Sequence, residues 1–173
     1  MRNYWLRSER LGFGHWSSND FELASRLWMD ADVMQHIGGP YTEEKVRARL
    51  AREIANQETL GIQYWPLFLL ETNAFAGCCG LRPQHDIMAL GFHLLPELWG
   101  RGLAPEAAKA VIAHAFGSLH ATTLYAGHNP HNTRSRRVLE ALGFEYWRDE
   151  FYEPTGLMHP CYLLVSASDS SAR

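Results

Sequence analysis

Two glycines, Gly100 and Gly102, separate a short apolar run from the most regular helical pattern in the sequence. Apolar residues recur at positions i, i+3, i+4 and i+7 over residues 104–119, which predicts a long helix. The run over residues 87–95 predicts a strand. A strand, a glycine loop and a helix in this order bring free backbone N–H groups and the positive end of a helix together, which suits an anion. Pro105 fits because its missing N–H costs least in a first helical turn.

The spacing of this loop leaves two interpretations open. A dinucleotide-binding fingerprint requires a third glycine where Pro105 stands, and a P-loop requires Gly-Lys-Ser/Thr, which the sequence lacks. A short glycine motif is also found in ordinary left-handed turns. The loop is therefore either an anion-binding loop of another kind or a turn without a ligand.

The rest of the chain alternates between helical and strand patterns, which is typical of an α+β domain. The predicted helices cover residues 21–28, 43–57, 104–119 and 133–142. The predicted strands cover residues 67–71, 75–81, 87–95, 122–126, 144–151 and 157–165. Thr42 is the expected N-cap of the second helix, and Gly143 is the expected stop of the last. Neither a repeat nor a linker interrupts this order.

Length and charge narrow the classes of protein that this chain can represent. Its 173 residues suit one domain, which we expect over residues 1–165. The serine-rich tail over residues 166–173 has nothing to bury and is expected to be disordered. Sixteen basic and nineteen acidic residues give a net charge of −3, which argues against a nucleic-acid partner. The sequence leaves open a monomer or a homodimer.

The cysteines and the N-terminal residues predict a reduced, cytoplasmic protein. Cys78, Cys79 and Cys161 are odd in number and two are adjacent, which is a poor disulfide framework. Neighbours on a strand point to opposite faces, so Cys78 and Cys79 are expected in the core on either side of a sheet. The N-terminal residues lack the apolar segment of a signal peptide. The longest apolar run is too short to span a bilayer, so we expect no membrane partner.

Nine histidines invite a metal site, but their spacing does not support one. His128 and His131 form the only close pair, and neither a cysteine nor an acidic residue completes a ligand set around them. We therefore predict no metal.

A second motif decides between the two interpretations of the glycine loop. Residues 129–144 read Asn-Pro-His-Asn-Thr-Arg-Ser-Arg-Arg-Val-Leu-Glu-Ala-Leu-Gly-Phe. With residues 99–104, Trp-Gly-Arg-Gly-Leu-Ala, this segment resembles the GNAT superfamily of acyl-CoA N-acyltransferases. The loop matches the family pattern (Gln/Arg)-x-x-Gly-x-(Gly/Ala), except that Trp99 replaces the first Gln or Arg, a substitution common in one branch of the family. The later segment matches Asn-x-x-Ser followed by Leu-Glu-x-Leu-Gly-Phe. Residues 6–11 and 91–96 resemble the first and fourth strands of the branch that contains ribosomal-protein alanine N-acetyltransferases.

The resemblance covers about residues 6–165 and implies both a fold and a cofactor. The implied fold is a single α+β domain with a mixed, mostly antiparallel sheet, splayed between its fourth and fifth strands and flanked by helices. Acetyl-CoA would lie in the opening. The residues that would bind it are Phe92, His93, Leu94, Leu95, Trp99, Gly100, Arg101, Gly102, Leu103, Ala104, Asn132, Ser135 and Arg137.

Some of these positions have an ordinary structural alternative. Asn132 suits a plain N-cap, and capping is compatible with a cofactor contact. Arg137 belongs to a basic cluster with Arg134 and Arg136, which is either a solvated helix face or a site for the 3′-phosphate of CoA.

The catalytic assignment departs from the family pattern. The tyrosine that many members use as a general acid would fall at Leu139, so Ser135 becomes the expected proton donor to the thiolate, with a first-turn helix role as the alternative. The N–H of Leu94 or Leu95 is expected to bind the carbonyl oxygen. Glu97 and His93 are the candidate bases, although proximity alone can suffice. Strand alternation places His93 and Leu95 on one face and Leu94 on the other.

The acceptor is the least defined part of the prediction. In this fold the first two helices and the final hairpin wall the acceptor cleft, and they bring in Trp28, Tyr41, Tyr64, Trp65, Tyr152 and His159, most of which are expected in the core. The nearby acids, which could attract a cationic amine, are Asp30, Asp32, Glu150 and Glu153. The predicted function is acetyl transfer from acetyl-CoA to a primary amine of a small molecule or a protein N-terminus, by direct attack on the thioester. The alternative is a non-catalytic acyl-CoA-binding or sensor domain.

Overall fold

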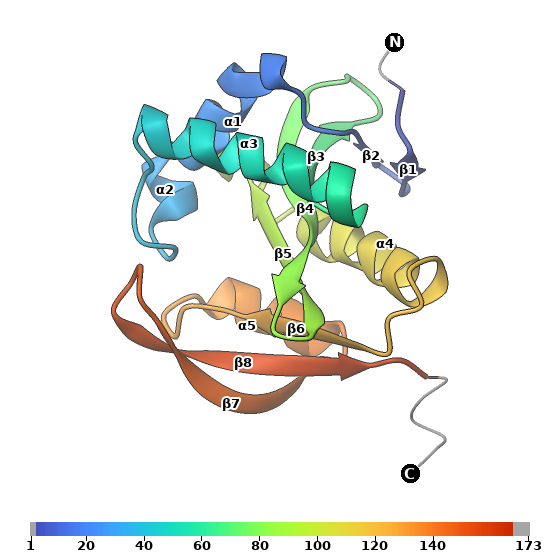
Figure 1. Cartoon of the computed structure of the whole chain (residues 1–173), viewed down its shortest axis with the longest axis vertical. Coiled ribbons are helices and arrows are strands. Elements are labelled where there is room, and N and C mark those ends of the chain that lie inside the picture. Colours follow the sequence, from blue (N-terminus) through green and yellow to red (C-terminus); the bar gives the residue numbers. More distant parts are fainter. Residues whose placement is uncertain (1–2, 168–173) are drawn as a thin grey trace.

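A computed structural model describes residues 3–167 as one eight-stranded sheet with helices on both faces (Figure 1). The strand order is β1-β2-β3-β4-β5-β6-β8-β7. The strands are β1 (Leu6–Arg7), β2 (Leu11–Phe13), β3 (Tyr64–Leu69), β4 (Phe75–Gln84), β5 (Ile87–Leu94), β6 (Thr123–Gly127), β7 (Glu145–Tyr152) and β8 (Leu157–Val165). The helices are α1 (Phe21–Trp28), α2 (Ala31–Met34), α3 (Glu43–Leu60), α4 (Leu103–Gly117) and α5 (Thr133–Ala141).

These elements confirm the predicted α+β order, and the local signals act where they were expected. The Thr42 hydroxyl caps α3 by accepting from the Lys45 N–H (3.3 Å), and Gly143 follows α5 with a φ of 88°. The short helix α2 has no counterpart in the prediction, because four residues are too few for a helical period to show. In the predicted tail, the Ser166 N–H donates to the Thr122 carbonyl (2.8 Å), and residues 168–173 lie outside the described residues.

Strand alternation divides most of the interior into two large cores, and a small third cluster contains Ala89, Tyr125 and Cys161. Cys78 packs in the core beneath α1, α2 and α3, while Cys79 packs in the core beneath α4. The two adjacent cysteines therefore lie on opposite faces of the sheet, as predicted, and both are free thiols. No helix within residues 3–167 has the length and apolar character needed to cross a membrane.

The sheet opens between β5 and β6, and this opening positions the site. The antiparallel pairing of β4 with β5 runs from Gln84↔Ile87 to Gly77↔Leu94, whereas β5 and β6 pair in parallel at only two positions, Met88↔Leu124 and Ala89↔Tyr125. Beyond Ala89 the described strands diverge, and the edge of β5 over residues 90–94 has no partner strand (Figure 1). The predicted splay is confirmed, because the expected fourth and fifth strands, over residues 87–95 and 122–126, are β5 and β6 of the structure.

A glycine is required where the end of β5 meets β4. Gly77 lies opposite Leu94 and has a φ of +140°. A Cβ atom there would come within 2.1 Å of the His93 carbonyl oxygen. Because glycine allows this close contact, β4 stays paired with β5 as far as Leu94, and the unpaired edge of β5 is the one that faces β6.

Candidate active site

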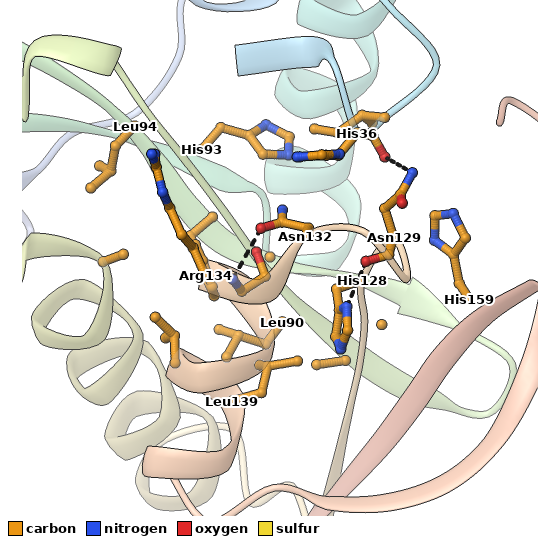
Figure 2. A pocket seen from close by; sticks show the side chains of 18 of the residues that line it. His36, Leu90, His93, Leu94, His128, Asn129, Asn132, Arg134, Leu139 and His159 are labelled. Atoms are coloured by element: carbon orange, nitrogen blue, oxygen red, sulfur yellow. Dashed lines mark hydrogen bonds between the residues drawn. The ribbon is translucent and has the colours of Figure 1, made fainter. Parts of the chain in front are cut away.

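A cavity of about 860 Å³ occupies the opening and passes the first turns of α4 and α5 (Figure 2). Most of the predicted cofactor residues line this cavity: Phe92, His93, Leu94, Trp99, Gly100, Gly102, Leu103, Ala104, Asn132, Ser135 and Arg137. Leu95, Glu97 and Arg101 are not in its lining. Residues that are 40 positions apart in the sequence therefore meet at one site.

The free edge of β5 presents the backbone of Leu94 rather than that of Leu95. The Leu95 N–H donates to the Ala76 carbonyl (3.0 Å), so it is already satisfied. In an antiparallel pair, bonded and non-bonded positions alternate, which leaves Leu94 opposite Gly77 in a non-bonded position with its N–H facing the cavity. Pro83, which has no N–H, occupies a non-bonded position of the same series. Of the two predicted donors, only Leu94 has a free N–H in this direction.

The glycine loop is pinned to the same strand end. The Trp99 indole N–H donates to the Leu94 carbonyl (2.9 Å), and the Arg134 guanidinium lies 4.6 Å from the centroid of the Trp99 ring. Gly100 and Gly102 have φ angles of 72° and 73°, in the left-handed region that favours glycine. Gly102 is the N-cap of α4 and has no side chain to bond the first-turn N–H groups. Those groups are therefore free for a ligand.

An outer anchor supports the loop from behind. Arg10 pairs with Glu106 (2.7 Å) and also donates to the Arg101 carbonyl (2.9 Å), while the Ser8 hydroxyl donates to Glu106 (2.6 Å). Burial raises the pKa of Glu106, but the hydrogen bonds from Ser8 and Arg10 outweigh it and lower the pKa overall. The backbone of Arg101 is thus part of the anchor, and its side chain is exposed.

The start of α5 contributes a cap and an uncommitted hydroxyl. The Asn132 Oδ1 accepts from the Ser135 N–H (3.1 Å), which confirms the capping role (Figure 2). The Ser135 side chain lines the cavity, and its hydroxyl bonds to none of residues 3–167. The basic cluster divides: Arg134 stacks on Trp99, Arg136 pairs with Glu140 (2.8 Å), and Arg137 lines the cavity.

The loop before α5 is held by Asn129, a residue for which no role was predicted from the sequence. Its side-chain N–H₂ donates to the His36 carbonyl (3.2 Å; Figure 2). Its Oδ1 accepts from the His131 N–H (2.9 Å). Asn129 therefore ties the end of α2 to the loop across the cavity. The His128 ring bonds the Asn129 carbonyl (2.8 Å) and the Tyr162 hydroxyl (3.2 Å), so both of its nitrogens are engaged. Within residues 3–167 no three metal-ligating side chains gather.

The two candidate bases occupy very different environments. His93 is enclosed, and burial, followed by the charges of Arg49 and Arg82, lowers its pKa to about 3. Its Nδ1 accepts from the Trp28 indole N–H (3.4 Å), which leaves a neutral ring with the other nitrogen protonated. Glu97 lies on the surface with 61% of its side chain exposed and pairs with Arg26 (3.3 Å). The prediction that His93 and Leu95 share one face and Leu94 the other is confirmed by the two cores.

The far end of the cavity is basic rather than acidic. Tyr64, Tyr152 and His159 line it, whereas Trp28 and Trp65 are core residues. Two guanidinium groups, Arg49 and Arg82, lie there as well. No motif marks either arginine, although alternation along β4 would have put Arg82 on the face of Cys78.

The four acidic residues expected to attract an amine at this end are either hydrogen-bonded within the protein, exposed or outside the cavity lining. Asp30 caps α2 by accepting from the Val33 N–H (2.9 Å). Glu150 lines the cavity but accepts from the Tyr125 hydroxyl (2.7 Å) and from Arg148 (2.9 Å). Asp32 is in the lining and exposed, and Glu153 is not in the lining.

Comparison with known proteins identifies the fold and its class. The profile of the acetyltransferase (GNAT) domain matches residues 10–145. YkkB of Bacillus subtilis (strain 168), an uncharacterized protein, is 30% identical over 128 residues, which are 72% of this chain and 74% of YkkB. The uncharacterized N-acetyltransferase p20 of Bacillus licheniformis is 27% identical over 146 residues, 81% of this chain and 82% of p20.

Solved structures agree over nearly the whole chain. An acetyltransferase from Agrobacterium tumefaciens str. C58 superposes with a TM-score of 0.81 at 26% identity, over 96% of this chain and 99% of its own. RimL, a ribosomal alpha-N-protein acetyltransferase solved in complex with coenzyme A, superposes with a TM-score of 0.77 at 15% identity, over 91% of this chain and 95% of its own.

The splayed sheet, the glycine loop at the start of α4 and the profile match define an acyltransferase. The chain belongs to the GNAT acetyltransferase family. Its structural neighbours include a ribosomal-protein acetyltransferase, with which it shares the fold.

Proposed function

We propose that this protein transfers the acetyl group of acetyl-CoA to a primary amine, of a small molecule or a peptide N-terminus. The observation that carries the proposal is the continuity of one cavity. It joins the glycine loop, the free edge of β5 and the basic far end, so an anionic cofactor and an acceptor can meet at Leu94. The three free cysteines support a cytoplasmic location.

The donor set in the cavity suits an acyl-CoA. Backbone N–H groups at the start of α4 match a pyrophosphate, because they are uncapped and lie at the positive end of a helix. The Phe92 and Leu94 edge of β5 offers an unpaired backbone to an amide-containing arm. Arg137 and Arg134, at the rim, are suited to the 3′-phosphate, since a guanidinium binds phosphate well.

Acetyl-CoA would supply a thioester for attack by the amine. The Leu94 N–H would donate to the thioester carbonyl oxygen and stabilise the charge that develops there, as a preorganised backbone donor can. The uncommitted Ser135 hydroxyl would hand its proton to the departing sulfur. Asn132 would hold the first turn of α5, and with it Ser135, against the cavity.

The proposal needs no protein base. His93 is neutral, and its free nitrogen carries a proton, while Glu97 is paired with Arg26 outside the cavity. An amine that enters uncharged and is held beside the carbonyl gains its rate from proximity and orientation. A water at the mouth of the cavity would take the proton that the amine nitrogen loses and return it to the Ser135 oxygen, so the acetylated amine and the free thiol leave with the serine hydroxyl restored.

The test is release of free thiol from acetyl-CoA in the presence of a panel of amines and N-terminal peptides. We expect thiol release that depends on the acceptor and an acetylated product by mass spectrometry. Binding of CoA without turnover for any acceptor would favour the sensor instead. A failure to bind CoA at all would refute the proposal.

A further inference from the structure

Arg82 is a cation without a counterion at the acceptor end of the cavity. It lies on β4 and lines the cavity, yet no hydrogen bond or ion pair joins its guanidinium to any of residues 3–167. Its Nε is fully buried without a partner, whereas the terminal nitrogens of the group are open to the cavity. A guanidinium withdrawn from water and left unpaired is costly, so its retention calls for a partner.

The neighbours of Arg82 supply no negative charge at neutral pH. The groups that act on it electrostatically are, in order, Tyr64, Tyr152, Arg49 and Tyr125, and the hydroxyl of Tyr64 chiefly raises its pKa. Burial is the main cause that raises the pKa of each of these tyrosines, so they stay neutral. Arg82 therefore keeps a full positive charge.

Apart from Asp32, which is exposed, the other charges of this end are already neutralised. Arg49 forms a buried ion pair with Glu53 (2.6 Å), and Glu53 also accepts from the Tyr64 N–H (2.7 Å). Glu150 is bonded to Arg148 and Tyr125. Among residues 3–167, Arg82 is the cation on the enclosed wall of the acceptor end that no ion pair compensates.

Arg82 lies on the same face of the sheet as His93, and His93 precedes Leu94 at the end of β5. Arg82 pairs with Ala89 across the β4–β5 ladder, His93 pairs with Cys78 of the same face, and both side chains line the one cavity. The positive charge of Arg82 also contributes to the lowered pKa of His93. The Tyr64 hydroxyl lies over Gly91, where a Cβ would come within 2.1 Å of it, and it forms the floor between the two points. A molecule held at Arg82 can thus reach the free edge of β5.

We propose that the acceptor is an amine that carries a carboxylate, and that the terminal nitrogens of Arg82 bind this carboxylate while the amine reaches Leu94. The planar guanidinium fork matches a carboxylate in two parallel hydrogen bonds. This inference rests on the proposed acetyl transfer and adds the substrate class. It replaces the expectation that acidic residues attract a purely cationic amine. A free amino acid and an acidic peptide N-terminus both supply the required chemistry.

The experiment compares acceptors that differ only in the carboxylate. Glycine, β-alanine, 4-aminobutyrate and 5-aminopentanoate are each assayed beside their amides, and the peptide Ala-Glu-Ala-amide beside Ala-Gln-Ala-amide. Spermidine and 2-phenylethylamine report on acetyl transfer to amines that lack a carboxylate. The readouts are kcat and KM for the acceptor and KM for acetyl-CoA. The free amino acids and the peptide pair distinguish the two sources of the carboxylate.

We expect at least one acid to exceed its amide by about 10- to 100-fold in kcat/KM, mainly through KM, because a hydrogen-bonded charge pair is lost in the amide. Arg82→Gln should abolish this preference and leave the KM for acetyl-CoA unchanged, and Arg82→Lys should keep part of it. Arg47→Gln is the matched control, because it removes an exposed arginine of α3 that pairs with Glu43 and is not in the cavity lining.

The possible failures are distinguishable. Equal rates for acids and amides in the wild type would overturn the inference, and that comparison needs no variant. A preference that survives in Arg82→Gln, or thiol release only with spermidine or 2-phenylethylamine, would overturn it while leaving acetyl transfer intact. Thiol release with none of the amines would contradict the proposed function itself.

Discussion

Ser135 has a backbone role and a side-chain role, and a single substitution separates them. The Asn132 cap bonds the Ser135 N–H, whereas the hydroxyl is free at the cavity wall. Ser135→Ala keeps the first and removes the second. We expect kcat to fall by about 100-fold, the lower range for a lost proton donor, with the KM for acetyl-CoA unchanged. Steady-state thiol release measures both, and Ser135→Thr, which keeps a hydroxyl, should retain most of the rate. An unchanged kcat in Ser135→Ala would exclude the hydroxyl as proton donor.

Residue-scale prediction works where the role belongs to the residue itself and fails where neighbours decide it. The capping side chain of Asn132 and the left-handed glycines were predictable, since local backbone geometry sets both. His93 was proposed as a base from its ordinary pKa. Its environment comes from Trp28, Arg49 and Arg82, which are distant in the sequence and reach it only in the folded chain.

At the scale of elements, the helix α5 depends on its cap both for stability and for the position of the site. Asn132→Ala should lower the free energy of unfolding by about 1 kcal/mol and weaken CoA binding. Asn132→Ser retains a capping oxygen, so it should restore stability while binding stays weak if the amide also contacts the cofactor. Urea unfolding and CoA titration give the two values. Full recovery of both by serine would assign Asn132 to capping alone.

The elements themselves followed from periodicity in most cases. The helix α4 and the strands β4 and β5 each have enough residues for a period of 3.6 or 2 to be evident. The four residues of α2 do not, yet α2 brings His36 to the Asn129 bond that closes the cavity. Alternation along β4 predicts the face of the sheet on which Arg82 lies. It does not predict a functional role for this arginine, because the lack of an ion-pair partner is evident only in the folded structure.

At the scale of the whole molecule, neutral histidines that folding withdraws wholly or partly from water make stability depend on pH. Burial is the leading cause that lowers the pKa of His15, His36, His93, His114, His128 and His159. Below their ordinary pKa of about 6.5 the unfolded chain binds protons that the folded chain does not, so stability falls as pH falls. Glu106 and Glu150 also have lowered pKa values in the folded chain. The unfolded chain binds protons at these carboxylates first, so the free energy of unfolding continues to fall at lower pH.

His93 gives this prediction a measurable slope. With a folded pKa of about 3, it should contribute up to about 1.4 kcal/mol per pH unit between pH 6.5 and 3. Urea unfolding at pH 7.5, 6.5, 5.5 and 4.5 should show decreasing stability, and His93→Gln should show a shallower decrease whatever its absolute stability. A wild-type stability that is constant or rises toward pH 4.5 would contradict the buried neutral ring.

The opening of the sheet is the whole-molecule feature that the patterns of single segments could not define. The residues of β5 predict a strand, but not that its parallel pairing with β6 ends after Ala89. The splay was expected only because two motifs, in order, resembled one family. Its consequence is that backbone groups of β5, rather than a basic surface, face the ligand, which is compatible with a net charge of −3.

Calorimetric titration of acetyl-CoA into the wild type and two glycine variants tests this cavity most directly. Gly102→Glu adds bulk and negative charge at the N-terminus of α4, where a phosphate would lie, and Gly117→Glu adds the same group at the other end of that helix in open space. Circular dichroism verifies that both variants fold. We expect Gly102→Glu to weaken binding by about 100-fold or more, through charge repulsion and through the strain of a side chain at a φ of 73°, with Gly117→Glu close to the wild type. Equal affinity in all three proteins would contradict the acetyl-CoA site at the glycine loop.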